Sequence, residues 1–247
     1  EDIKANKGGA RVWSHGKEKS GADPKPPKWT FVEPALCTLV DVAPSGDRWL
    51  HEIKYDGYRL MASVSGKRVR LFTRSGLDWT GKFTQIADAL AGLGLKDVLL
   101  DGEAAVADAK GRTDFSSLQK ALEGGDAKGV SYFVFDLLAA GDKDLRKLPL
   151  SERKQKLGHV LKGARAPIRL SPVLHGDGPD ILEAFREKGL EGVVSKKADS
   201  AYRGGRSLSW LKTKCANERE FVIVGYQPSE KRPFSSLLLA DRERGKL

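Results

Sequence analysis

Short strand-like segments that pair as hairpins restrict the fold of this chain more than any other feature of its sequence. Residues 58–74 carry alternating apolar side chains around a Ser-Gly-Lys turn at 65–67, which is typical of a β-hairpin. Further strands are predicted at 48–55, 97–108, 130–140, 191–197 and 221–227. Helical periodicity occurs at 83–94, 114–122, 151–161 and 179–190. The helices interrupt the strands without regular strand–helix–strand alternation, so the sequence predicts an α+β fold of mainly antiparallel sheets flanked by helices.

Composition divides the chain into three parts. Residues 1–29 are rich in Lys, Gly and Pro and have almost no apolar periodicity, which is typical of a basic linker or arm. Residues 30–217 hold the predicted strands and helices of one compact unit. Residues 218–247 are expected to open a second unit, with a polar hinge at 217–219.

The overall charge favours a polyanionic partner. The 247 residues carry a formal net charge of +10, and nucleic acid is the first candidate for such a partner. The 40% hydrophobic content is enough for a core, and no long apolar run predicts a membrane span. Cys37 and Cys215 are far apart in sequence, which argues against a disulfide framework and favours a reducing, cytoplasmic environment.

One short stretch, HEIKYDGYR at 51–59, contains a candidate nucleophile, Lys54. A lysine amine attacks phosphorus only when neutral, and at its reference pKa neutralising it at physiological pH costs roughly 4 kcal/mol. Nearby cations such as Arg59 or a metal ion lower that cost. Asp56 would oppose this effect unless it binds a cation or a sugar hydroxyl, and Gly57 lets the backbone approach a ligand. The alternative is a strand end followed by a charged turn.

Six ordered elements make the chain resemble the covalent nucleotidyltransferases, and most closely the ATP-dependent DNA ligases. The resemblance covers residues 30–217 and rests on EIKYDGYR (52–59), RSG (74–76), DGE (101–103), FVFD (133–136), EGVVSK (191–196) and WLKTK (210–214). It implies an adenylation domain followed by an OB-fold domain, of which 218–247 would be only the beginning. The chain is therefore expected to bind nucleotide but to self-adenylate and seal nicks poorly by itself.

The amino-acid sequence around these elements is similar to that of the ligase module of bacterial DNA ligase D, a multifunctional end-joining enzyme. The segments that carry this likeness include VWSHGKE in the arm, FVEPALCTLV, and FVIVGYQPSEKR after the last element. The likeness implies a role in double-strand break repair at the nucleoid. It also implies tethered phosphoesterase and polymerase domains and a DNA-end-binding protein as partners, with nicked or broken duplex DNA as substrate.

The resemblance implies a three-step reaction. Lys54 attacks the α-phosphorus of ATP and forms lysyl-AMP, the AMP moves to a DNA 5′-phosphate, and a 3′-hydroxyl displaces it. Each step builds negative charge at phosphorus, so the site needs cations placed beforehand. Lys212 and Lys214, two apart on a predicted strand, are expected near the α-phosphate. Arg59 and Arg74 are expected to grip phosphate.

The remaining candidates concern the metal ion and the base. Asp101, Glu103 and Glu191 are the expected ligands of Mg²⁺ or Mn²⁺, and Glu103 is also expected at the nucleotide. Phe135 resembles the aromatic residue that stacks on adenine, although core packing is the alternative for it. Glu52 is expected to read the adenine edge or the sugar.

Two other functions stay open at this point. An RNA ligase or an mRNA-capping guanylyltransferase shares the Lys-x-Asp-Gly element. A non-enzymatic, basic DNA-end-binding module would use its lysines only to neutralise phosphate. ATP is favoured over NAD because residues 1–29 are too short and too polar to be the upstream domain of the NAD-dependent ligases.

Overall fold

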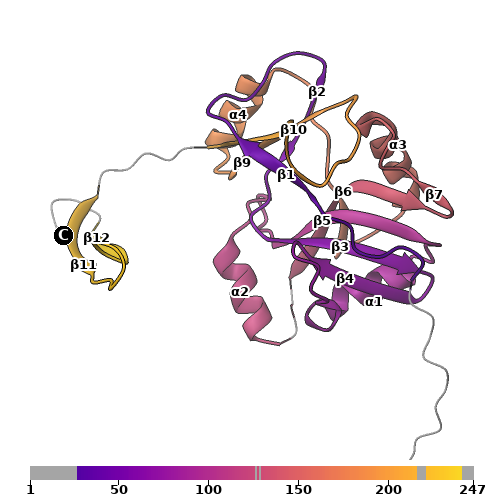
Figure 1. The fold of residues 1–247 in the computed structure, drawn as a ribbon, viewed down its shortest axis with the longest axis horizontal. Helices are drawn as coiled ribbons and strands as arrows, with labels where there is room; N and C mark the ends of the chain where they lie inside the picture. Colours follow the sequence, from indigo (N-terminus) through magenta and orange to yellow (C-terminus); the bar gives the residue numbers. More distant parts are fainter. Residues whose placement is uncertain (1–26, 126, 128, 216–220, 241–247) are drawn as a thin grey trace, which may run out of the picture.

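A computed structural model describes residues 27–125, 127, 129–215 and 221–240 (Figure 1). The predicted arm lies almost entirely outside these residues, and so does the predicted hinge. The strands are β1 (Ala35–Leu39), β2 (Trp49–Ile53), β3 (Tyr58–Ser65), β4 (Arg68–Thr73), β5 (Val98–Val106), β6 (Val130–Ala140), β7 (Lys143–Asp144), β8 (Ile168–Leu170), β9 (Gly192–Lys197), β10 (Gly205–Lys214), β11 (Val222–Gln227) and β12 (Ser236–Ala240). The helices are the short 3₁₀ turn η1 (Thr80–Lys82), α1 (Thr84–Gly92), α2 (Phe115–Glu123), α3 (Leu150–Val160) and α4 (Gly178–Glu187).

The larger sheet has the strand order β4-β3-β5-β6-β7, with β8 added beside β6. The predicted hairpin is confirmed: β3 and β4 pair antiparallel, and Ser65 and Arg68 face each other across the turn. Gly66 has a positive φ of 62° in that turn, a conformation that glycine adopts without strain. The β8 strand pairs parallel to β6, a pairing that the alternation pattern did not indicate.

The smaller sheet has the order β1-β10-β9-β2. Its β9 strand pairs antiparallel with both β10 and β2, whereas β1 runs parallel to β10. The prediction of mainly antiparallel sheets is therefore confirmed, with two parallel pairs as exceptions. This sheet brings β2, which precedes the candidate nucleophile, beside β9 and β10 from the far end of the sequence.

Three helices, α1, α2 and α3, pack on one face of the larger sheet. Ile86 and Leu90 of α1, with Leu118 of α2 and Leu157 of α3, are fully buried in the core between helices and sheet. Asp114, the first residue of the helix expected at 114–122, caps α2, because its side chain accepts hydrogen bonds from the backbone amides of Ser116 and Ser117. The opposite face of the sheet carries a second core.

That second core joins the two sheets. Met61, Leu99 and Phe135 from the larger sheet pack with Ala35 and Trp210 from the smaller one. The fourth helix, α4, lies on the outer side of the smaller sheet, against β9. The two sheets thus meet on one apolar face, and a cavity lies beside it.

The last described strands form a sheet of their own. The predicted strand at 221–227 is confirmed as β11, and it pairs antiparallel with β12. Their apolar side chains, among them Ile223 and Leu239, are largely exposed. An OB-fold identity for this hairpin remains a prediction. Among the described helices, none has the length and apolar character needed to cross a bilayer.

Candidate active site

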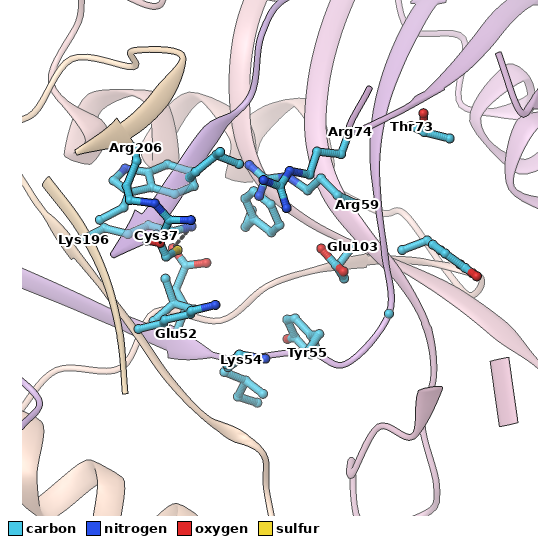
Figure 2. A pocket seen from close by; sticks show the side chains of 18 of the residues that line it. Cys37, Glu52, Lys54, Tyr55, Arg59, Thr73, Arg74, Glu103, Lys196 and Arg206 are labelled. Carbon is cyan, nitrogen blue, oxygen red and sulfur yellow. Dashed lines mark hydrogen bonds and ion pairs between the residues drawn. The ribbon is translucent and has the colours of Figure 1, made fainter. Parts of the chain in front are cut away.

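A cavity of about 630 Å³ lies between the two sheets (Figure 2). Both sheets and the loops after β2 and β4 contribute to its wall. The predicted site residues that line it are Glu52, Lys54, Gly57, Arg59, Arg74, Glu103, Phe135 and Lys212. Lys54, the candidate nucleophile, therefore does not point into bulk solvent: its side chain is only 16% exposed.

Lys54 stands directly after β2, and its backbone amide donates to the carbonyl of Gly192 at 2.9 Å. Its amine forms an ion pair with Glu191, another predicted site residue. The second carboxylate oxygen of Glu191, Oε2, is buried without a hydrogen-bond partner among the described residues. The ion pair holds the amine against Glu191, so the pair has to separate before the Lys54 nitrogen can bond to phosphorus.

The loop that follows Lys54 is held close to β5 and α2. A Cβ atom on Gly57 would lie 2.1 Å from the carbonyl oxygen of Ala104, so only glycine fits there. The Asp56 carboxylate accepts a hydrogen bond from the amide of Phe115 at 3.3 Å, and the Asp56 amide donates to Thr113 at 2.8 Å. Asp56 therefore joins the lysine loop to the start of α2.

The structure gives Asp101 a role other than the predicted one. Its two carboxylate oxygens accept from Nε and Nη2 of Arg59 at 2.6 and 2.7 Å, and the Tyr202 hydroxyl also donates to it at 2.5 Å. Asp101 is fully buried and does not line the cavity. The prediction that it binds a metal ion is not supported, because its oxygens are already used to hold the Arg59 guanidinium at the cavity wall.

Glu103 lies two residues further along β5 and does line the cavity. Burial raises the pKa of Glu103 to about 7, against the opposing effect of Arg59 and Lys54. The described residues contain no group of three or more His, Cys, Asp or Glu side chains placed to hold a metal ion. The predicted three-carboxylate site is therefore reduced to two candidates: Glu103, which lines the cavity, and Glu191, which is ion-paired to the cavity-lining Lys54 and has an unpartnered Oε2.

Glu52 is buried at the end of β2 and is surrounded by cations. Lys196 of β9 and Lys154 of α3 both reach its Oε1 atom, at 3.0 and 2.7 Å, and Ser171 donates to Oε2 at 3.3 Å. Burial alone would raise the pKa of Glu52, but the two lysines hold it below its usual value. No sequence pattern pointed to Lys154, whereas Lys196 ends the EGVVSK element and could have been proposed from it.

Phe135 lines the cavity as predicted, but its ring is nearly covered. Only 7% of the residue is exposed, and the ring packs edge-on against Trp210. The guanidinium carbon of Arg59 lies 4.5 Å from the ring centroid, and Nζ of Lys196 lies 4.2 Å from it. Stacking of a base on this ring thus requires one of the two cations to move, and it stays a prediction.

The phosphate-binding candidates are brought together only in part. Arg74, directly after β4, and Lys212 of β10 line the same cavity. Lys214 lies at the exposed end of β10 and is not part of the wall. Arg206, at the start of the same strand, lines the cavity although it was not predicted (Figure 2). Its position four residues before the WLKTK element was the available signal.

The titration of Glu103 is expected to lower the stability of the folded protein as the pH rises. Its folded-state pKa of about 7 lies above the ordinary 4.5, so the folded chain retains a proton that the unfolded chain loses. This contribution is complete below pH 4.5 and is lost as the pH rises through 7. Glu103→Gln removes the titration, so the variant should exceed the wild type in free energy of unfolding by about 2 kcal/mol at pH 8.

Urea denaturation at pH 4.5 and pH 8 measures this difference. Glu123→Gln, at an exposed position of α2, is the matched control and should follow the wild type at both pH values. If Glu103→Gln is no more stable than the wild type at pH 8, the raised pKa of Glu103 in the folded chain is contradicted.

Comparison with known proteins gives a matching family model and similar curated proteins. Residues 37–214 match the family model described as ATP dependent DNA ligase domain. The multifunctional non-homologous end joining protein LigD of Pseudomonas aeruginosa is 43% identical over 233 residues, which is 92% of this chain and 27% of that protein. The LigD of Mycobacterium tuberculosis H37Rv is 35% identical over 220 residues, 88% of this chain and 28% of that protein.

A solved structure, mycobacterial DNA ligase D complexed with ATP and MES, has a TM-score of 0.67 and 35% sequence identity. The match covers 84% of this chain and 67% of that one. The chain spans little more than a quarter of the length of the two curated relatives.

Proposed function

Because the chain belongs to the family of ATP-dependent DNA ligase domains, we propose that Lys54 forms a covalent bond to AMP and passes it to a DNA 5′-phosphate. The observation that carries this proposal is the place of Lys54. Its amine stands in the wall of a cavity that also contains the cations Arg59, Arg74 and Lys212. Such preplaced positive charge is what a phosphoryl-transfer site requires.

In the first step the Lys54 nitrogen bonds to the α-phosphorus of ATP, the bond from that phosphorus to the bridging oxygen breaks, and pyrophosphate leaves. The amine must first lose a proton. The amine is engaged by Glu191, so the ion pair has to separate before attack. Arg59 and Lys212, in the same cavity wall, would then face the negative charge that develops at the α-phosphate.

The carboxylates fit a divalent cation shared with the nucleotide. Mg²⁺ is usually held by one or two carboxylates together with substrate phosphates, and the orphaned Oε2 of Glu191 together with the Glu103 carboxylate would supply them. When bound, Mg²⁺ or Mn²⁺ would neutralise charge on the phosphates. Asp101 takes no part in this proposal, since Arg59 and Tyr202 occupy its oxygens.

The later steps and partners are proposed from the relatives. The AMP moves from Lys54 to the DNA 5′-phosphate, and a 3′-hydroxyl then displaces it and closes the strand. The names of the LigD relatives, multifunctional non-homologous end joining proteins, support a proposed role of this reaction in end joining of DNA breaks. Further catalytic domains and a DNA-end-binding protein as partners, in the cytoplasm, belong to the same proposal. The exposed β11–β12 hairpin fits the opening of an OB-fold domain.

Intact-mass measurement after incubation with ATP and Mg²⁺ tests the proposal. The wild-type chain should slowly gain the mass of one AMP moiety during a prolonged incubation, as its expected poor self-adenylation requires, and Lys54→Ala should gain none. Lys67→Ala, in the exposed β3–β4 turn, is the control for loss of a lysine and should form the adduct. An adduct that persists in Lys54→Ala refutes the assignment of the nucleophile.

The same measurement separates the related functions. GTP in place of ATP should give no adduct, and an adduct with GTP alone would identify a guanylyltransferase. Offering the adduct to a nicked DNA duplex should release the AMP onto the DNA 5′-phosphate. Transfer to RNA but not to DNA would identify an RNA ligase instead.

A further inference from the structure

A charge cluster made of Glu52, Lys154 and Lys196 lies at one end of the cavity. Both lysines reach the same atom of Glu52, Oε1, although they come from different elements. The Glu52 and Lys196 side chains are 1% and 2% exposed, and that of Lys154 is 8% exposed. The cluster is therefore almost free of solvent and carries two positive charges for one negative charge.

The two lysines differ in what else they contact. Glu52 and Lys196 line the cavity, and Figure 2 shows the two side chains directed toward each other. Lys154 is not part of the wall and reaches Glu52 from α3. The Nζ atom of Lys196 also lies between two rings, 4.2 Å from the centroid of Phe135 and 4.1 Å from that of Trp210.

With only one lysine beside it, a buried carboxylate would keep that lysine in the ion pair, because leaving the carboxylate charge unpaired costs several kcal/mol. The second lysine changes this balance. With Lys154 compensating Glu52 from outside the cavity, Lys196 keeps N–H donors for a ligand, and the Glu52 carboxylate stays ionised as an acceptor. The end of the cavity then offers one acceptor and one donor side by side, a pattern that suits the edge of a purine base.

We propose that Lys154 is a positioning residue for base recognition, which acts from outside the cavity by compensating Glu52 so that Glu52 and Lys196 both face the nucleobase. This inference rests on the proposed function, because that function places a nucleotide in the cavity. The 6-amino group of adenine is a donor that would pair with Glu52, and the ring nitrogen beside it is an acceptor that would pair with Lys196. Without Lys154, Lys196 turns wholly to Glu52, and both contacts with the base weaken.

Nucleotide binding without covalent transfer tests the inference. The dissociation constants of ATP and of purine riboside triphosphate, which lacks the 6-amino group, are measured by calorimetry on the full chain in EDTA. The wild type should bind ATP on the order of tenfold more tightly than the analogue. Lys154→Met, which keeps the apolar stem but not the charge, should weaken ATP binding about tenfold and analogue binding only about threefold, because the analogue keeps the ring nitrogen for Lys196 but has no 6-amino group for Glu52.

Two further variants keep the result interpretable. Lys154→Arg restores the positive charge and should restore the preference for ATP. Lys156→Met, at an exposed position on the same helix, should behave as the wild type. If Lys154→Met does not fold, Lys154→Gln takes its place and should show the same loss of preference for ATP over the analogue.

Two outcomes overturn the inference. A preference for ATP that is unchanged in the charge-removing variant shows that Lys154 does not act on base recognition. An equal loss of affinity for both nucleotides shows that it serves only the fold. Failure of the proposed function is distinguishable from either outcome, since it appears as a missing AMP adduct with Mg²⁺ and leaves the EDTA binding data intact.

Discussion

Replacing Arg153 with Met is expected to lower the free energy of unfolding by about 3–5 kcal/mol. Arg153 and Asp136 are both fully buried, and two hydrogen bonds of 2.8 and 2.9 Å join the guanidinium to the carboxylate. The remaining nitrogen of Arg153 donates to the carbonyls of Leu148 and Ser200. Its loss leaves the buried Asp136 charge without its partner and removes the ion pair that joins α3 to β6.

An exposed pair in the same protein is the matched control for this prediction. Arg146 and Asp144 form a bond of similar length, 2.6 Å, but their side chains are 39% and 38% exposed. Arg146→Met should therefore cost at most about 1 kcal/mol. Urea denaturation curves of the two variants give both values. Equal losses in free energy of unfolding for Arg153→Met and Arg146→Met would show that burial does not make the Arg153–Asp136 pair more important for stability.

Turns and helix starts could be predicted from the sequence, because each depends on residues that are close together in the chain. The β3–β4 hairpin has its turn at Gly66, and the α2 helix begins at its Asp114 cap. The parallel pairing of β1 with β10 joins segments some 170 residues apart, and no local pattern indicates which distant strand becomes a neighbour.

The candidate site was predictable where a recognisable motif carries residues that line the cavity. Lys54, Arg59 and Glu103 come from elements that the chain shares with a known family, and all three line the cavity. Lys154 was not predictable, because it reaches Glu52 from an otherwise ordinary amphipathic helix. Asp101 and Glu103 were predicted to share one role, since side chains two apart on a strand point the same way. Which partner each carboxylate meets depends on the neighbouring strand β3, which supplies Arg59, and on the sequence-distant Tyr202.

Replacing Asp101 with Ala is expected to lower the free energy of unfolding by about 3 kcal/mol, and to do so without any metal present. Its neighbour Arg59 has a side chain only 16% exposed, so removal of the carboxylate leaves a nearly buried guanidinium without its ion-pair partner. Tyr202→Phe removes one donor to the same carboxylate and should cost about 1 kcal/mol. Urea denaturation in EDTA measures both losses.

The EDTA condition separates a positioning role for Asp101 from metal binding. A carboxylate that only binds Mg²⁺ repels its neighbours in the empty site, so its removal would leave the metal-free protein as stable as before or more stable. That is the direction expected for Glu103→Gln above pH 7, on the same strand. Asp101→Ala should change stability in the opposite direction, because the Asp101 charge is compensated within the protein by Arg59. If Asp101→Ala is as stable as the wild type without metal, Asp101 is again a candidate metal ligand.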